Sequence, residues 1–154
     1  MAINYTRLNT ILQTDPYTLG VSLALSNEVN RDKLNVASQK IDAPVIISDL
    51  LQWLASTGIM DRLKKQSDLH ISEQIRSICQ TVLRMIDRPE ILEIDVREAK
   101  KVTMLDALVT GGVVTAAEKT DLLDKVAKRS ATVAEKEGWD VIYLTNNDVM
   151  WARG

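Results

Sequence analysis

The chain has 154 residues, of which 45% are hydrophobic and 26% charged, and this balance is that of an ordinary globular protein rather than a disordered one. Its formal net charge of −2 provides no global field for phosphate backbones, so nucleic acid is not expected as a partner. No apolar run approaches the roughly 20 residues that a membrane span needs, so no membrane partner is expected either. A single cysteine and an N-terminus without a secretion signal predict a protein made and folded in a cytoplasm.

The composition favours helices. The chain contains no Phe and only three Pro, so its core must be built from Leu, Ile, Val, Ala and Met, which pack well between helices. We predict an all-α fold, with residues 1–154 forming a single helical domain and only short extended segments.

The N-terminal segment predicts a short helix over residues 4–12, with Asn4 as its N-cap. Pro16 ends this helix because it has no amide hydrogen and disfavours helix in the residue before it. Residues 17–25 are ambiguous between an extended apolar segment and a helix weakened by Gly20.

A second short helix is predicted from a Ser26 cap to about Leu34, with Val29 and Leu34 facing inward. Residues 35–43 form a polar connector with little periodicity. We expect this connector to be an exposed loop or arm.

The middle of the chain begins with a β-branched stretch, residues 44–47, which should run extended into the next helix. That helix is expected from Ser48 to Thr57 and is ended by Gly58, and a further turn or two should cover Ile59–Lys65. The inward-facing residues of the helix expected from Ser48 to Thr57 are predicted to be Leu50, Leu51 and Leu54.

The most regular apolar pattern in the sequence lies between Ile71 and Ile86, where apolar residues recur at steps of four and three. Pro89 bounds this helix, and residues 90–94 form a linker or a brief strand. The predicted inward face consists of Ile71, Ile75, Ile78, Val82 and Met85.

A helical hairpin is predicted over about residues 95–128. Its first helix carries an apolar stripe within 102–109, and Gly111 and Gly112 end it. Thr115 and Glu118 form a capping box for the second helix. Two helices joined by so short a turn must lie close together, and we expect much of the chain to pack around them.

The C-terminal segment should contain a short helix capped by Ser130 and ended by Gly138. An extended stretch at 141–143 follows, and the cap pattern of Thr145 and Asp148 then predicts a final turn of helix.

No constellation of catalytic residues emerges. The only histidine, His70, lacks partners at the spacing of a triad or a metal site, and Cys79 falls on an apolar helix face without an activating base. The carboxylates between Glu90 and Glu98 show no calcium-loop pattern, and no nucleotide, hydrolase or redox signature occurs. We therefore predict a protein that is not an enzyme, with no catalytic residues, no metal site and no cofactor.

The 102–127 hairpin could alternatively serve a small cytoplasmic regulator that binds DNA or another protein, because helix–turn–helix readers use that architecture. Its second helix, however, carries acidic residues where phosphate or base contacts would be useful.

The C-terminal aromatic residues are the candidate partner interface, since Trp is favoured at interaction hot spots. Core closure by the same tryptophans is the alternative. The terminal segment itself either folds back onto the chain's own core or docks against a neighbour, and docking is slightly favoured. The candidate interface residues are Trp139, Tyr143, Val149, Met150 and Trp151.

Four stretches occur in a recognisable order: YTRLNTILQTDPYTLG, SDLLQWLASTG, MLDALVTGGVVTAAEKTDLL and NDVMWARG. In this order the chain resembles a type of small structural-region protein encoded by tailed bacteriophages and prophages. The resemblance covers most of the chain except residues 35–43 and 59–70, and it carries no catalytic residues. It implies a virion location after synthesis in the host cytoplasm. It further implies a structural or assembly role, in the tail or head–tail region, with other virion proteins as partners and multiple copies in a symmetric assembly.

Overall fold

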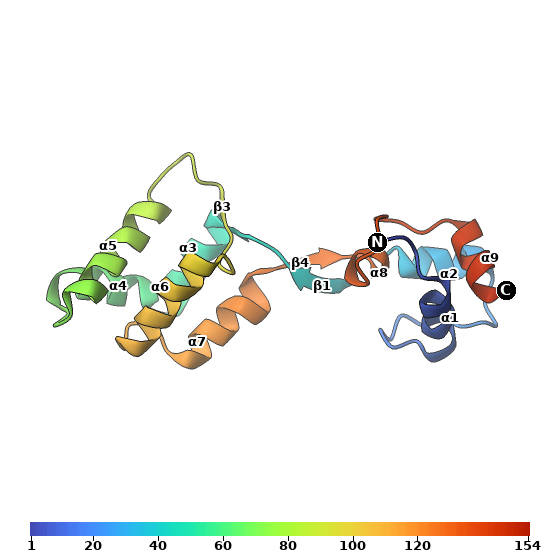
Figure 1. Ribbon diagram of the computed structural model, residues 1–154, viewed down its shortest axis with the longest axis horizontal. Coiled ribbons are helices and arrows are strands. Elements are labelled where there is room, and N and C mark those ends of the chain that lie inside the picture. The colour runs from blue at the N-terminus through green and yellow to red at the C-terminus, as the bar shows by residue number, and fades with distance from the viewer. The chain divides into compact units, whose positions relative to one another are not determined.

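The computed structural model describes all 154 residues and is mostly helical (Figure 1). Nine helices make up 57% of the chain, and two small antiparallel sheets of two strands each accompany them. The helix-rich character predicted from composition is confirmed. The purely all-α class is corrected by the two sheets, which form where β-branched or alternating segments meet a partner strand.

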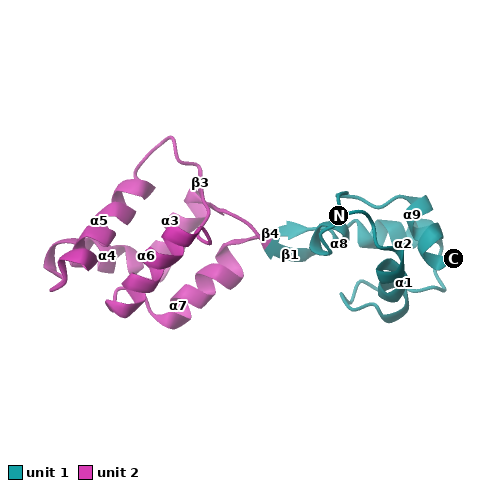
Figure 2. Ribbon diagram, in the orientation of Figure 1, with its two compact units in different colours: residues 1–41, 129–154 teal, residues 42–128 magenta.

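The chain divides into two compact units, coloured separately in Figure 2. Unit 1 consists of residues 1–41 and 129–154, and unit 2 of residues 42–128. This differs from the single domain expected around the 102–126 hairpin. The reason is that the two terminal segments bury their apolar residues against each other and form a core of their own.

Unit 1 is built from the two ends of the chain. The N-terminal and C-terminal helices pack against one another, and both termini lie in this unit (Figure 1). Asn4 caps the first helix by accepting a hydrogen bond from the Arg7 amide, as predicted. The helices of unit 1 are α1 (Tyr5–Thr14), α2 (Asn27–Leu34), α8 (Val133–Lys136) and α9 (Asn146–Arg153).

The core of unit 1 is closed. Its central side chains come from every helix of the unit and are almost wholly removed from water. They are Leu8, Ile11, Leu12, Leu34, Val133 and Val149, none more than 1% exposed.

Unit 2 is a continuous stretch of chain and contains the predicted hairpin. Gly112 adopts a φ of 73°, the left-handed conformation that ends α6, and the capping box of Thr115 and Glu118 is present. Its helices are α3 (Ile47–Ser56), α4 (Ile59–Leu69), α5 (Glu73–Ile86), α6 (Ala99–Thr110) and α7 (Ala116–Asp121), the last continuing as the π-helical turn η1 (Leu122–Val126).

The strands are short. β2 (Val45–Ile46) pairs antiparallel with β3 (Glu93–Ile94), which places Val45 opposite Ile94 within unit 2. β1 (Gln39–Asp42) pairs with β4 (Lys128–Ala131), and the chain passes from one unit to the other within these two strands. Part of the connector expected as an exposed loop at 35–43 is therefore a strand.

Three predicted inward positions are wrong. Val29 is 40% exposed, Leu51 36% and Ile71 95%. Ile71 lies outside because α5 begins only at Glu73, after the Ser72 cap, so Ile71 belongs to the preceding turn. Trp53, which the apolar pattern did not select, is buried instead and donates its indole N–H to Asp121.

Candidate functional site

The C-terminal helix α9 has one buried and one exposed face. Val149 and Ala152, three residues apart, lie in the core of unit 1. Met150 and Trp151 point away from it and are 47% and 57% exposed. The terminal segment therefore folds back onto its own unit and still presents two large apolar side chains to solvent.

Trp151 is held in place by an aromatic neighbour. Its ring meets Tyr5 edge to face, with centroids 5.8 Å apart and planes at 87°. The Tyr5 hydroxyl donates to Asp148 at 3.1 Å. Burial, followed by this contact with a carboxylate, raises the pKa of Tyr5. The exposed indole of Trp151 therefore packs against Tyr5, whose hydroxyl is itself hydrogen-bonded to Asp148 of α9.

The end of α9 is also tied to the α2 region. The Arg153 guanidinium donates to the Leu25 carbonyl at 3.0 Å and to the Asn27 side chain at 2.6 Å. These contacts fix the helix that carries Trp151, so a partner would meet a preorganised surface.

The loop before α9 presents two further apolar side chains, Ile142 (55% exposed) and Tyr143 (64%). The loop is pinned on both sides of them. Thr132 donates its hydroxyl to the Ile142 carbonyl at 2.5 Å, and the Asn35 side chain accepts from the Leu144 amide at 2.7 Å.

Of the five candidate interface residues, the structure leaves three available. Trp139 is 6% exposed and Val149 0%, so both belong to the core of unit 1 and are not displayed at its surface. Tyr143, Met150 and Trp151 are exposed. We call these three, together with Ile142, the C-terminal apolar set.

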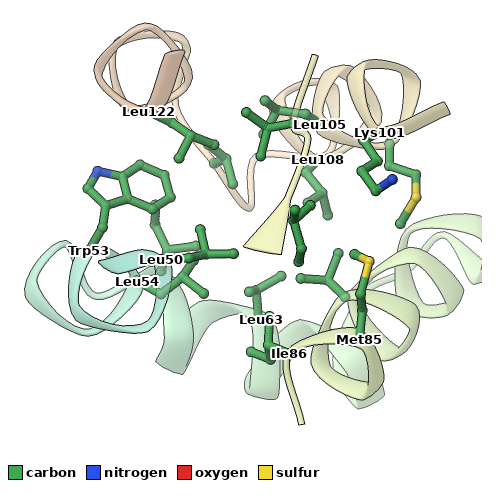
Figure 3. A pocket seen from close by; sticks show the side chains of 16 residues that line it. Leu50, Trp53, Leu54, Leu63, Met85, Ile86, Lys101, Leu105, Leu108 and Leu122 are labelled. Atoms are coloured by element: carbon green, nitrogen blue, oxygen red, sulfur yellow. The ribbon is translucent and has the colours of Figure 1, made fainter. Parts of the chain in front are cut away.

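Unit 2 contains an apolar cavity that the sequence did not reveal. It has a volume of about 80 Å³, and side chains of α3, α5 and α6 point into it (Figure 3). Lys101 is the only charged residue among those that line it, and its ammonium is paired with Glu98. Lining residues labelled in the figure include Leu50, Met85, Ile86, Leu105 and Leu108.

The half-buried side chains that line the cavity all come from α5 and α6. They include Val82 and Met85 of α5 and Met104 and Leu105 of α6. Methionine side chains adapt to differently shaped apolar groups, and two of them belong to this half-buried part of the lining.

The turn between α4 and α5 carries two strongly exposed aliphatic side chains. Leu69 is 70% exposed and Ile71 95%, on either side of His70. The His70 ring accepts from the Ser72 amide at Nδ1 (3.0 Å), and its Nε2 lies 2.9 Å from the Gly111 carbonyl. Both ring nitrogens are used to brace this turn, which gives the only histidine a structural role.

Cys79 is fully buried, and burial raises the pKa of its thiol. A raised pKa keeps the sulfur protonated near neutral pH, whereas a nucleophilic cysteine needs its thiolate.

Both basic residues within the 102–127 hairpin are paired with carboxylates. Lys119 contacts Asp106 of α6, and Lys125 contacts Asp121 at 2.7 Å. Arg62 of α4 pairs with Glu118 at 2.5 Å, which lowers the pKa of that carboxyl. These acids neutralise the charges that a DNA backbone would need.

No group of three or more His, Cys, Asp or Glu side chains is placed to hold a metal ion. No helix has the length and apolar character required to cross a membrane. No protein-family model, no curated protein and no solved structure matches the chain.

Proposed function

We propose that this chain is a non-enzymatic structural or assembly protein of a tailed-phage particle, acting through protein–protein contacts in the tail or head–tail region. The resemblance of the sequence supplies the phage context. The observation that carries the contact role is the outward display of Met150 and Trp151 on a helix whose opposite face is fully buried. A rigid, exposed tryptophan is the kind of side chain that dominates binding energy at protein interfaces.

The C-terminal apolar set would be the contact surface for another virion protein. The loop that carries Ile142 and Tyr143 is held by the Thr132 hydroxyl, which donates to the Ile142 carbonyl, and by the Asn35 side chain, which accepts from the Leu144 amide. Arg153 of α9 donates to the Leu25 carbonyl, so little conformational entropy would be lost on docking. Each exposed side chain would gain apolar burial without any change in the core of unit 1.

Quantitative mass spectrometry of density-purified particles of the encoding phage or prophage tests the role. A copy number in fixed ratio to known particle proteins supports it. Absence from particles, together with salt-dependent retention of the chain on DNA, would favour a cytoplasmic regulator acting through the 102–127 hairpin.

A matched pair of variants tests the surface. The double substitution Met150→Ser, Trp151→Ser should leave the core folded, lower the melting temperature only by the loss of the Trp151–Tyr5 ring contact, and lower incorporation into particles by at least about tenfold. The control is Val36→Ser in the same unit, because Val36 is 56% exposed, as Trp151 is 57%. Equal incorporation of both variants would remove the C-terminal apolar set from the contact.

A further inference from the structure

We propose that unit 2 carries a docking site for a basic, apolar segment of another protein chain, in the open hollow between the start of α3 and the connector that joins α5 to β3. The site lies in unit 2, so it is separate from the C-terminal apolar set of unit 1 and goes beyond the function proposed for that set. The size of the hollow, its exposed apolar side chains, its fixed backbone and its charge carry the inference.

The hollow is formed by residues 46–48 and by residues 86–92, which lead from α5 to β3 (Figure 1). Its volume is about 360 Å³. An apolar cavity of about 150 Å³ admits one benzene, so the hollow has room for roughly two side chains of that size. Its apolar lining includes Ile46, Ile47, Ile86, Ile91 and Leu92.

Two of these aliphatic side chains remain largely in water. Ile46 is 55% exposed and Leu92 75%. The opposite face of the β2–β3 pair is the buried one, because the cross-strand partners Val45 and Ile94 are only 1% and 5% exposed. A segment that covered Ile46 and Leu92 would therefore bury apolar surface without disturbing the core of unit 2.

Backbone hydrogen bonds fix the hollow in the isolated chain. The Ile47 amide donates to the Leu92 carbonyl at 2.9 Å, which ties the start of α3 to the end of the connector. The Ile91 amide donates to the Arg88 carbonyl at 3.2 Å and closes a turn around Pro89. Docking would order little of this backbone, which lowers the entropic cost of binding.

The charged residues of this region are mostly acidic. Residues 45–49 and 86–93 contain four carboxylates and one guanidinium, all of them exposed and none in an ion pair. Their net charge is −3, whereas the whole chain carries only −2. Counting Arg84 as well, one turn before Arg88 in α5, leaves −2. The five residues are Asp49, Asp87, Glu90, Glu93 and Arg88.

Two of the carboxylates are placed directly at the hollow. Asp87 lines it. Glu93 is the cross-strand partner of Ile46, so the two side chains are neighbours on the same face of the β2–β3 pair. An apolar side chain that packs on Ile46 therefore lies beside a carboxylate, and a lysine or arginine close to it in sequence would find an opposite charge.

The same charge opposes other occupants. Carboxylates repel the phosphates of nucleic acid and the headgroups of an anionic membrane. A second copy that docked through the same face would set two acidic rims against each other. The matching chemistry is that of a protein segment with two aliphatic side chains flanked by lysine or arginine.

A peptide titration of the ¹⁵N-labelled full chain, followed by NMR, tests the site. Alternate residues of an extended segment share one face, so the end-blocked peptide KKLSLKK presents two leucines and its outer lysines together. Saturable shifts are expected in the amides of residues 45–49 and 86–93. The peptides EELSLEE and KKSSSKK, which reverse the charge and remove the leucines, should bind at least about tenfold more weakly. No saturable shifts, shifts centred elsewhere, or equal affinity for EELSLEE would overturn the proposal.

Matched variants separate the apolar part of the site from a general surface effect. Leu92→Ser should weaken KKLSLKK binding by at least about tenfold at a melting temperature close to wild type, because this side chain is already in water. The control is Leu69→Ser, since Leu69 is 70% exposed in the same unit. Equal affinity of the two variants for the peptide would overturn the proposal.

A second pair of variants tests the acidic rim. Glu90→Gln, Glu93→Gln should weaken binding by at least about threefold and reduce its dependence on salt. Asp68→Asn, Glu73→Gln also removes two exposed, unpaired carboxylates from unit 2 and should leave binding unchanged. Equal losses in the two double variants would show only a general effect of charge and would overturn the site.

Sedimentation of the chain without peptide tests whether a second copy fills the hollow instead. Any self-association of the wild type should be unaffected by Leu92→Ser. Association that the substitution abolishes would mean that the occupant is another copy of this chain, and it would overturn the proposed partner.

Discussion

The two units bury apolar side chains in different ways. Unit 1 joins segments more than 100 residues apart and fastens them with side-chain hydrogen bonds, such as Asn35 to the Leu144 backbone and Arg7 to Glu137 at 2.9 Å. Unit 2 is continuous in sequence, consists mainly of helices in apolar contact, and retains a cavity of about 80 Å³. The unit assembled from remote segments has the closed core, and the unit that is continuous in sequence retains the cavity.

The polar contacts explain how the remote segments of unit 1 find one arrangement. Asn30 is 0% exposed, and its side chain bonds both the amide and the carbonyl of Ser22, at 3.1 and 2.8 Å. A buried amide is satisfied in only a few geometries, so it selects one docking of the loop against α2. Apolar contacts between helices, as in unit 2, are less selective.

The largest expected effect is that of deleting residues 145–154. The deletion removes α9 with its buried Val149 and Ala152, so α1 and α2 lose the helix against which they pack. Hydrogen exchange followed by mass spectrometry should show loss of amide protection in α1 and α2, with protection in α5 and α6 retained. The double variant Met150→Ser, Trp151→Ser is the control and should keep protection in both units. Unchanged protection of α1 in the truncated chain would mean that α9 contributes nothing to the core of unit 1.

A smaller effect is expected from paired truncations of one side chain in each core. Ile11→Ala should lower the free energy of unfolding of unit 1 by about 3–5 kcal/mol, since Ile11 is 0% exposed in a closed core. Leu105→Ala should cost unit 2 about 1–2 kcal/mol, because this side chain is half-buried and already borders a cavity. Denaturant-dependent hydrogen exchange reports both units in one experiment. Equal costs would contradict the difference in packing between the two cores.

A fall in pH should destabilise unit 1 by protonating the Glu137 carboxylate. Hydrogen bonds from Arg7, and further from Tyr17, lower the pKa of this carboxyl below the ordinary value of 4.5. Because the pKa of Glu137 is lower in the folded chain than in the unfolded chain, its ionised carboxylate stabilises unit 1 fully at any pH above the unfolded-state pKa. This stabilisation is lost as the pH falls through the folded-state pKa. Glu137→Gln should therefore destabilise unit 1 at pH 7 and flatten the dependence of its melting temperature on pH below about 4.5. Glu118→Gln, which removes the partner of Arg62, is the corresponding change in unit 2 and should leave the acid response of unit 1 intact.

Local features were predictable from the sequence, and remote ones were not. The caps at Asn4, Ser26 and Thr115 and the glycine stop after α6 depend on residues within one turn of helix, so their patterns identify them. The division into two units depends on pairing of α9 with α1 and α2 across the whole chain, which no local pattern encodes.

The candidate contact surfaces were predictable only in part. Periodicity marks which face of a helix is apolar, but it does not tell whether that face is covered. Trp139 and Trp151 look equivalent in sequence, and only the fold buries the first and exposes the second. Ile71 fits the periodic stripe of α5 and lies outside only because Ser72 caps the helix after it.

The smallest expected effect concerns one motif that occurs in both units. Thr115 and Glu118 cap α7, and Thr132 and Glu135 cap α8, each with both reciprocal hydrogen bonds of a capping box. The second box has the same T-x-x-E pattern and was missed because Ser130, two residues earlier, also suits a cap. Thr115 is exposed, so Thr115→Ala should cost about 1 kcal/mol, the usual value of a lost N-cap.

The same substitution should cost more in unit 1. Thr132 is 1% exposed, and its hydroxyl also donates to the Ile142 carbonyl, so Thr132→Ala leaves a carbonyl of the 141–144 loop without its partner. We expect a loss of about 2 kcal/mol, roughly 1 kcal/mol beyond the value for Thr115→Ala. Thermal unfolding combined with hydrogen exchange for each unit measures the difference. Thr132→Ser, which keeps the hydroxyl, should recover most of it; if the serine variant is as unstable as the alanine variant, the cost comes from the lost methyl group and not from the hydrogen bond to the loop that carries Tyr143.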